Sequence, residues 1–533
     1  MPMQRLPSTV TTFRRMRWAV PATVLALVLA ACGEDASPDE PTAAPEGTAT
    51  TPAEPTEATT PSPTPTPVPE VEVPLAVVTG YTNSKASITL EELGTGNVLV
   101  PCEITDLSLA LEGDGECVPL ENIVARIESE PERLALLPPS DVVPQVKVLP
   151  IDGADIFGGP AARGLDYPLT GRGQDLEPHD AGEIRTLISL GDSCPDRGVA
   201  HAAITLGRGW EWVFGGGTAE YTAVYPNPVA PGQVGHGFNI VDAVPTGNEG
   251  AVAELVSGAD ITVNDFECPV VDNWRVNEGV IFTIDPRVLG HLRDDYGVDV
   301  ATLAANHLFD AGTSGFLETL DKFDEAGIAR TGAGRDLDEA LEPAVLDVDG
   351  MRFGFVGFNE IPGSIEAGPG QPGVAWLREA QMREGVGRAR DRSDLVFCLP
   401  QWWGGLEYHD VWYPSIREQQ RIFFEAGCDH ILGHGTHWSG PIDFTDLGDG
   451  RTGFTIMSHG NFLFGQSWSQ QTQEGVIVEL AFRGTELAQA RMHPYIMLEQ
   501  AQTNLTDPET DGMWVLNRIY EASGLPVVAP VEP

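Results

Sequence analysis

The chain has 533 residues, of which 42% are hydrophobic, and its formal net charge is -47, from 78 acidic and 31 basic side chains. A chain of this length is too long for one ordinary domain, so we expect two folded units. A surface this acidic repels phosphate backbones and argues against nucleic acid as a partner. The acidity itself indicates a soluble surface rather than a specific cation-binding role.

The first 32 residues have the order of an export signal. Arginines precede an apolar run over residues 19–31, which is too short for a permanent membrane anchor. The segment Leu29-Ala30-Ala31-Cys32 resembles the lipobox of bacterial lipoproteins, whose cysteine becomes the lipid-bearing N-terminus. We therefore expect Cys32 to anchor the protein in the cell membrane at its extracytoplasmic face. An ordinary secretory peptide with a chance cysteine is the alternative.

A linker and a small module follow. Residues 33–74 are almost wholly Pro, Thr, Ala, Glu and Ser, a composition that predicts a disordered tether. Residues 75–173 contain apolar runs, a predicted helix over residues 121–139 and a predicted strand over residues 143–152, which indicate a small α/β module. Its role is open between a carbohydrate- or peptide-binding lobe and a structural spacer.

Seven cysteines are present, and lipidation of Cys32 would leave an even number. Cys102 and Cys117 bracket a short, acidic, turn-rich stretch that suits a local disulfide, and an exported location permits such bonds. The sequence leaves open whether the other four pair or remain buried thiols; these are Cys194, Cys268, Cys398 and Cys428.

Residues 183–500 repeat a pattern of strand, loop and helix in which apolar strands end in polar clusters. The clusters lie at residues 191–192, 264–267, 306–307, 401–404, 433–437 and 458–461. Because ligands gather at the carboxyl ends of strands in α/β folds, we expect these six loops to face one site. Residues 501–533 follow as a C-terminal segment with a predicted helix over residues 514–522.

Five side chains in these loops are of the types that divalent metal ions bind: Asp192, Glu267, Asn306, His434 and His437. A single Asp after a strand is usually a turn or helix-cap residue. The shared position of the five, each after its strand, is what indicates a metal site. Two ions about 3.5 to 4 Å apart can hold a phosphoryl group between them.

Several stretches of residues 185–487 resemble the CapA family, which is associated with poly-gamma-glutamate capsule synthesis. The most discriminating are ANHLFDAG with the TGAG that follows it, and GHGTH with the later GNF; GDSCPDRGV and NDFECP also match. The resemblance implies an α/β fold, the four-layered α/β/β/α sandwich of the metallophosphoesterase-like proteins of the calcineurin type.

The resemblance also implies a centre with one or two divalent ions, namely manganese, zinc or iron. Asp192 and His437 would bind one ion, Asn306 and His434 would bind the other, and Glu267 would bridge the two.

Three further positions match the family and carry implied roles. His307 would serve as the general acid for the leaving oxygen, with helix capping or packing as the alternative. Asp310 would orient a neighbour or satisfy a turn. Arg197 would bind an anionic group of the substrate through its guanidinium fork, and a surface salt bridge is the alternative.

One departure from the family pattern concerns the metal ligands. The family usually has His-Trp-Gly before its Glu-Tyr pair, whereas this chain has Trp402-Trp403-Gly404, and Trp cannot bind a metal ion. One ion site is therefore expected to be weakened or lost. His459 and the thiolate of Cys194, which would favour zinc, are two candidate compensating ligands. A loop hydrogen bond for His459 and a buried thiol or disulfide for Cys194 are the alternatives.

These features predict a cell-surface metallophosphoesterase-like hydrolase or transferase. Its partner would be an envelope polymer or phosphoester in capsule or polyglutamate synthesis, export or anchoring. The alternative is a non-catalytic lipoprotein that binds an envelope polymer and keeps a partial metal site. A solute-binding transport lipoprotein would explain the tether but not the ligand loops.

Overall fold

The computed structural model describes residues 69–111, 115–225, 240–277 and 279–527. The predicted export signal, Cys32 and the linker up to residue 68 lie outside these residues. Within the described ranges, no helix combines the length and the apolar character needed to cross a membrane.

The first folded segment contains two small sheets. A three-stranded sheet has the order β1-β8-β4, and a five-stranded sheet has the order β5-β3-β6-β2-β7. The strands are β1 (Val71–Pro74), β2 (Ala76–Gly80), β3 (Val98–Pro101), β4 (Ile104–Leu107), β5 (Glu116–Val118), β6 (Leu134–Leu137), β7 (Val146–Leu149) and β8 (Thr170–Gly173). Strand β1 occupies the last 4 residues of the segment assigned to the linker.

Helix α2 (Leu120–Ser129) is shorter than the helix predicted for its segment. Ile123 and Ile127 lie four residues apart, so both side chains reach the core from one helix face. The prediction extended the helix to residue 139 and was wrong there, since the chain turns at Pro131 and then forms β6. The module also contains helices α1 (Leu90–Thr95) and α3 (Pro160–Arg163).

Two large sheets form the rest of the described chain. The ten-stranded sheet has the order β11-β10-β26-β25-β24-β9-β12-β13-β14, with β23 paired to β9. Its strands are β9 (Ile184–Cys194), β10 (Thr218–Tyr225), β11 (Ile240–Gly247), β12 (Ile261–Phe266), β13 (Val300–Thr302), β14 (Ala329–Thr331), β23 (Asn461–Phe464), β24 (Glu474–Arg483), β25 (Glu486–Leu498) and β26 (Gln502–Leu505).

The second large sheet has six strands in the order β16-β17-β19-β20-β22-β21. Its strands are β16 (Ala344–Val348), β17 (Met351–Asn359), β19 (Leu395–Gln401), β20 (His430–Leu432), β21 (Ile442–Asp446) and β22 (Thr452–Ile456). A short pair, β15 (Ala333–Gly334) and β18 (Gly373–Val374), lies apart from both sheets in the strand pairing.

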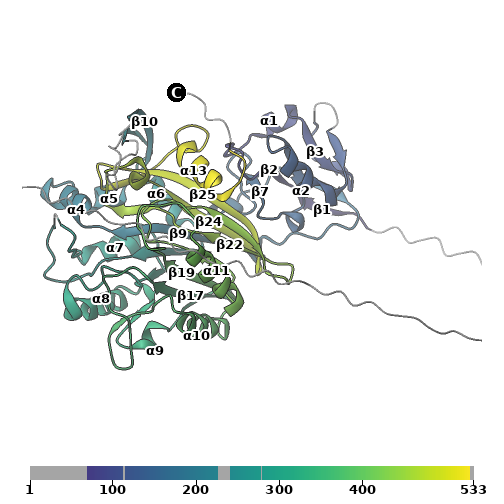
Figure 1. Cartoon of the computed structure of the whole chain (residues 1–533). Helices are drawn as coiled ribbons and strands as arrows, with labels where there is room; N and C mark the ends of the chain where they lie inside the picture. The colour runs from purple at the N-terminus through teal and green to yellow at the C-terminus, as the bar shows by residue number, and fades with distance from the viewer. Residues whose placement is uncertain (1–68, 112–114, 226–239, 278, 528–533) are drawn as a thin grey trace, which may run out of the picture. The chain divides into compact units, whose positions relative to one another are not determined.

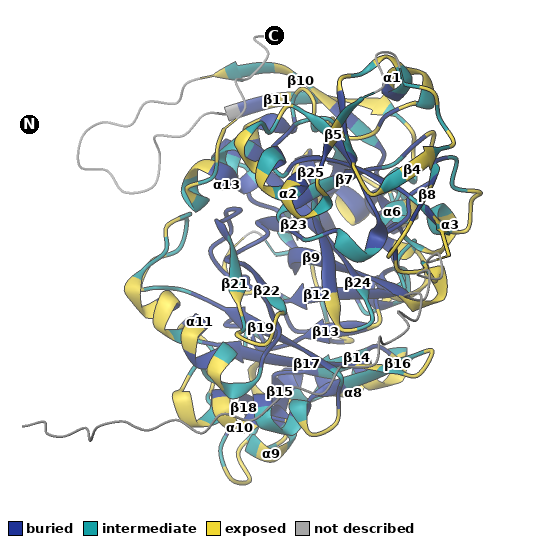
Figure 2. Ribbon diagram, turned by 90° about the vertical axis from the view of Figure 1, so that its right-hand side faces the viewer, coloured by how far each residue is buried: buried dark blue, intermediate teal, exposed yellow. Residues whose placement is uncertain are grey.

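An apolar layer joins the two large sheets. Val263 and Val478 enter it from β12 and β24, and Phe355 and Phe397 enter it from β17 and β19. Helices cover the other face of each sheet: α5 to α8 on the ten-stranded sheet, and α10 and α11 on the six-stranded sheet (Figure 1). Figure 2 shows the central strands β9, β12 and β17 as buried, whereas α10 and α11 expose their outer faces. The predicted α/β class with four α/β/β/α layers is confirmed.

The helices of this domain are α4 (Arg197–Ala200), α5 (Trp210–Phe214), α6 (Ala251–Ser257), α7 (Arg287–Asp294), α8 (Gly312–Ala326), α9 (Leu337–Ala340), α10 (Glu379–Arg390), α11 (Pro414–Ala426), α12 (Gln470–Gln473) and α13 (Met513–Ser523). The helix predicted over residues 514–522 is confirmed as α13. Its buried residues Val515, Leu516 and Ile519 extend the apolar layer between the sheets.

The N-terminal module packs against the β24–β25 hairpin. Val148 and Phe157 of the module share one buried cluster with Ala481 of β24. Asp155 of the module forms an ion pair of 2.8 Å with Arg491 of β25. These contacts bury polar and apolar groups together, so they hold the module against the β24–β25 hairpin.

Three disulfides are present among the described residues. The predicted bond between Cys102 and Cys117 is confirmed, with Cα atoms 5.0 Å apart. Cys194 pairs with Cys268, which joins the end of β9 to the segment after β12, and Cys398 pairs with Cys428. The proposal that Cys194 offers a thiolate to a metal ion is therefore wrong, because its sulfur is bonded to Cys268.

Replacing Cys194 and Cys268 together by serine should lower the free energy of unfolding by about 4 kcal/mol, since the bond closes a loop with a sequence separation of 74. The matched control replaces Cys102 and Cys117, whose separation is 15 and whose loss should cost about 3 kcal/mol. Urea unfolding of both double variants measures the difference. A larger loss in the control would contradict the loop-length argument.

Candidate metal centre

The predicted ligand loops lie at the carboxyl ends of parallel strands in both large sheets. β9, β12, β13 and β14 run parallel, and β17, β19, β20 and β22 do so in the other sheet. The six strands predicted to precede the loops are β9, β12, β13, β19, β20 and β22. Polar side chains from both sheets therefore meet at one edge of the apolar layer.

Asp192 occupies the middle of this arrangement. Its backbone is in register with Asp265 on β12 and with Asn461 on β23. Its amide donates to the Gly460 carbonyl at 2.9 Å. Gly191 allows this approach, because a Cβ atom there would lie 2.1 Å from the Gly460 oxygen. The close strand pairing thus fixes the Asp192 carboxylate in a fully buried position.

Two groups of side chains could each hold a metal ion. One contains Asp192, Glu267 and His437, and the other contains Asp192, Asp265 and His434; all are buried, and within each group the ligand atoms lie within 4.8 Å of one another. Asp192 is common to both groups, whereas the family resemblance implied Glu267 as the bridging residue. Asp265 is a candidate ligand that our sequence analysis missed.

The imidazoles contact the shared carboxylate directly. His434 Nδ1 lies 3.5 Å from Asp192 Oδ1, and His437 Nδ1 lies 3.2 Å from Asp192 Oδ2. His437 Nδ1 also lies 2.9 Å from Asn461 Oδ1. The backbone of His437 is in the left-handed region, with φ at 60°, a conformation that non-glycine residues adopt rarely and often at functional sites.

The charges of the centre are strongly perturbed. Burial and then the charge of Asp192 raise the pKa of Asp265 and Glu267 well above their usual values. Burial alone would raise the pKa of Asp192, but hydrogen bonds and positive charge from His434 and His437 hold it low. Burial alone would lower the pKa of His437, but Asp192 raises it. Three carboxyl groups in one buried space thus repel one another, and a divalent cation would relieve the repulsion.

The donor atoms fit such a cation. The carboxylate oxygens of Asp265 and Glu267, and Nε2 of His434 and His459, are buried without a hydrogen bond of normal geometry in the described part of the chain. Buried polar atoms normally have a partner. Carboxylate and imidazole ligands suit manganese, zinc and iron alike, so the donor set is compatible with a divalent ion without selecting one.

His459 lies against this group. Its ring stacks on His434 with the centroids 4.8 Å apart, and its Nδ1 is 3.0 Å from the Gly433 carbonyl. The loop hydrogen bond that was the alternative for His459 is therefore present. Because the carbonyl only accepts, Nδ1 carries the proton and Nε2 keeps a free lone pair. Burial, followed by the charge of His434, lowers the pKa of His459 to about 3, so the ring is neutral.

Asn306 enters the site beside Gln401, and its predicted role as a metal ligand stays a prediction. The Gln401 side chain accepts from the Asn306 amide at 3.1 Å and donates to Asn306 Oδ1 at 3.3 Å. Trp402, the residue that replaces the family histidine, is fully buried in the outer core between the six-stranded sheet and its helices. The side chain that β19 directs toward the site is thus Gln401, which our sequence analysis did not single out.

His307 and Asp310 form a pair next to Asn306. His307 Nδ1 lies 2.9 Å from Asp310 Oδ2, and the same oxygen accepts from the Phe282 amide at 2.9 Å. Asp310 thus both orients His307 and satisfies a backbone group, the two roles considered for it. Because this hydrogen bond engages Nδ1, Nε2 is the ring nitrogen left for proton transfer.

Arg197 lies at the side of the centre. Its guanidinium carbon is 4.5 Å from the centre of the Phe282 ring, and its Nε donates to the Gly279 carbonyl at 2.8 Å. Burial lowers the pKa of Arg197, against the charges of neighbouring groups that include Glu267. Within the described chain Arg197 makes no ion pair, so the surface salt bridge considered for it is not formed.

Comparison with known proteins gives relatives for this region. The chain is 29% identical over 243 residues to the capsule biosynthesis protein CapA of Bacillus anthracis. The aligned region covers 44% of this chain and 57% of that protein. It is 27% identical over 235 residues to the PGA biosynthesis protein CapA of Bacillus subtilis (strain 168), with coverage of 43% and 59%. The matches thus span less than two thirds of either relative.

Among solved structures, a 5'-nucleotidase precursor from Thermus thermophilus aligns with a TM-score of 0.33 and 15% identity, over 60% of this chain and 56% of that one. The model of the family described as bacterial capsule synthesis protein PGA_cap matches residues 186–466. Because this match takes in more than half of the chain and every candidate metal ligand, the chain belongs to the PGA_cap family.

Proposed function

We propose that this protein is a metal-dependent hydrolase or transferase of the phosphoesterase type. It would act on an envelope polymer or a phosphoester during the synthesis, export or anchoring of capsule or polyglutamate. Lipidation of Cys32 would hold it on the extracytoplasmic face of the cell membrane. The two Bacillus relatives are named for capsule and PGA biosynthesis, which supports a role for this protein in the synthesis of such a polymer.

The observation that carries the proposal is the buried cluster of unpartnered carboxylate and imidazole atoms around Asp192. Burying several ionisable groups without partners costs free energy, and structural cores avoid it. An arrangement that keeps them together is typical of a site that binds a cation.

The surrounding side chains would have different roles in such a reaction. A cation held by Asp192, Asp265, Glu267, His434 and His437 would supply Lewis-acid polarisation of a substrate oxygen. His307 would give a proton to the leaving oxygen while Asp310 holds its ring in place. Arg197, fixed on the Phe282 ring, would bind an anionic group of the substrate.

A second candidate is a non-catalytic protein that binds an envelope polymer. One observation favours it: the position at which the family supplies a histidine is occupied by Trp402, which packs in the outer core. In this case the remaining ligands would hold an ion with a structural role. Loss of metal from the variants below would then leave polymer binding intact.

The metal site is tested by elemental analysis of the purified protein beside Glu267→Ala and His434→Ala. Each variant removes one ligand, so we expect the metal content to fall by about tenfold or more at limiting metal. His201→Ala, which alters an exposed histidine away from the cluster, should keep the parent content. Parent protein that stays free of metal after incubation with zinc or manganese would contradict the proposal.

Metal binding should release protons. The raised pKa values of Asp265 and Glu267 mean that these carboxyls hold protons in the metal-free protein at pH values where exposed carboxyls have lost them. A cation must displace those protons, so its affinity should rise as the pH rises. Calorimetric titration with zinc or manganese in two buffers of different ionisation enthalpy measures the release. A binding heat that is independent of the buffer would show that none occurs.

Two neighbouring substitutions test which residue of β19 faces the centre. Trp402→His removes a buried ring from the outer core and should cost about 3 kcal/mol of stability without any gain in bound metal. Gln401→His places an imidazole beside Asn306 and should raise metal affinity. Urea unfolding and metal titration of the two variants provide the comparison. More metal in Trp402→His than in Gln401→His would reverse the assignment.

A further inference from the structure

A cavity of about 850 Å³ lies between the N-terminal module and the C-terminal strands of the domain. Its walls come from the module, from β10 and β25, and from residues 505–520. None of the candidate metal ligands lines it. Cavities of this size suit small organic ligands, so this one constitutes a second site to explain.

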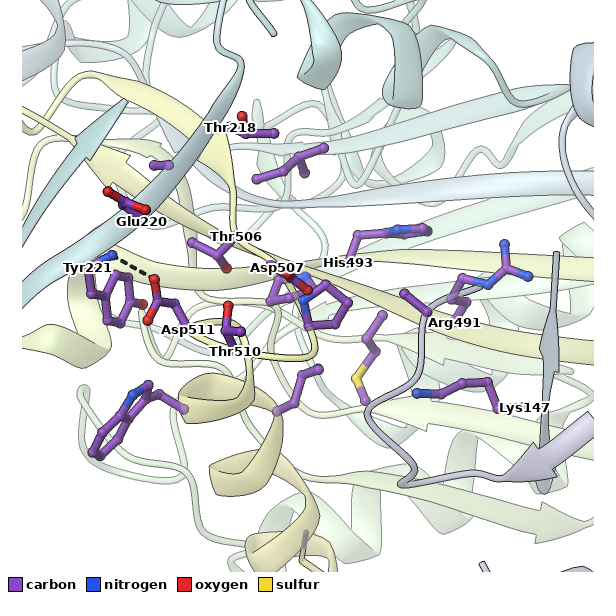
Figure 3. Close-up of a pocket in the computed structure, with 18 of the residues that line it drawn as sticks. Lys147, Thr218, Glu220, Tyr221, Arg491, His493, Thr506, Asp507, Thr510 and Asp511 are labelled. Carbon is purple, nitrogen blue, oxygen red and sulfur yellow. Dashed lines mark hydrogen bonds between the residues drawn. The ribbon is translucent and has the colours of Figure 1, made fainter. Parts of the chain in front are cut away.

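Lys147 provides the positive charge at one end of the cavity (Figure 3). Its ammonium group donates to the Asn83 carbonyl, and no carboxylate of the described chain lies within ion-pair distance. Burial, with the charge of Arg491, lowers the pKa of Lys147 to about 8, against the opposing charge of Glu509. Lys147 is one of only three lysines in this acidic chain, and an anionic ligand group would supply the ion-pair partner that Lys147 lacks among the described residues.

Two hydroxyl groups in the cavity wall also lack partners. The Tyr81 hydroxyl and Thr506 Oγ1 are buried and form no hydrogen bond with the residues that the structure describes, and Thr506 is only 4% exposed. They belong to the module and to the C-terminal segment, respectively. Buried hydroxyls are rarely left unpaired, so both indicate a ligand that carries hydrogen-bonding groups.

The other end of the cavity is acidic. In Figure 3, Lys147 and Arg491 lie on one side of the cavity, and Glu220 and Asp511 lie on the opposite side. Apolar side chains such as Met492 and Leu516 also line the wall. The cavity therefore offers a cation at one end, carboxylates at the other, and apolar surface in its lining.

The separation of positive and negative side chains in the cavity favours some classes of ligand over others. Arg491 is already bound by Asp155 at 2.8 Å and by Glu479 at 3.1 Å. Lys147 therefore contributes the one lysine or arginine charge in the described lining that has no ion pair, and a single ammonium argues against a phosphate group. The acidic end disfavours a polyanion. An elongated molecule with a carboxylate at one end and an amine at the other matches both ends.

We propose that this cavity binds a short peptide, with its terminal carboxylate at Lys147, its backbone amides at Tyr81 and Thr506, and its amino end toward Glu220 and Asp511. The site is separate from the metal centre and goes beyond the proposed reaction. Peptide binding would bring the module and the C-terminal segment into contact with one ligand.

The test uses calorimetry or ligand-observed NMR with the whole protein and three probes: trialanine, triglutamate and trilysine, each also as its C-terminal amide. At least one free acid should bind, and its amide should bind about tenfold more weakly, since it loses a charge-assisted hydrogen bond. In Lys147→Met the difference between acid and amide should disappear. Lys322→Met, which removes a half-buried lysine on α8 far from the cavity lining, is the matched control and should behave as the parent.

Inorganic phosphate and N-acetylglucosamine serve as competing probes. The proposal is overturned if no peptide binds the parent protein, if either competing probe binds in place of the peptides, or if Lys147→Met binds acid and amide as the parent does. Thermal unfolding and metal content establish that the variant is folded. Should Lys147→Met fail to fold, Thr506→Val carries the same test, and unchanged peptide affinity in that variant would overturn the proposal.

Discussion

The burial of Asp192, Asp265 and Glu267 in one place is the constraint on which the rest of this structure depends. The apolar layer between the two large sheets ends at these carboxyls, and the charge that gathers there cannot be solvated by water. Imidazoles from the second sheet supply part of the compensation. The position of each sheet is thus tied to the electrostatics of the edge that they share.

The backbone holds these groups with little freedom. Strands β12 and β23 flank β9 in fixed register on either side of Asp192, and Gly191 lets β9 approach the Gly460 carbonyl. The disulfide between Cys194 and Cys268 then joins the ends of β9 and β12 directly beyond the ligands. A site assembled from six loops needs such restraints, since a displacement of about 1 Å is enough to spoil metal geometry.

The sequence was sufficient to locate the strands, the loops and most of the candidate ligands, because apolar runs that end in polar clusters mark strand ends in α/β folds. Two further site residues, Asp265 and Gln401, were also predictable from the sequence. Ile261 and Val263 alternate into the apolar layer, and the same period of two places Asp265 on that face. Likewise Phe397 and Leu399 point inward, which directs Gln401 into the site and Trp402 into the outer core.

Other features could not be predicted from the sequence. The pairing of Cys194 with Cys268 depends on the adjacency of β9 and β12, which only the sheet order defines. The helix of the module was overextended because residues 134–137 are apolar, and a short apolar run does not distinguish a helix end from a strand. The cavity at Lys147 is built from segments more than 300 residues apart, so no local sequence pattern predicts it.

The disulfide beside the candidate metal centre also has a consequence for the order in which the site is assembled. The bond locks the segment of Asp192 to that of Glu267, so a chain with free thiols lacks a restraint on two of its ligands. Disulfides form in oxidising compartments and are rare where glutathione keeps thiols reduced. The candidate ligands Asp192 and Glu267 would therefore reach their final spacing only after the two thiols have been oxidised.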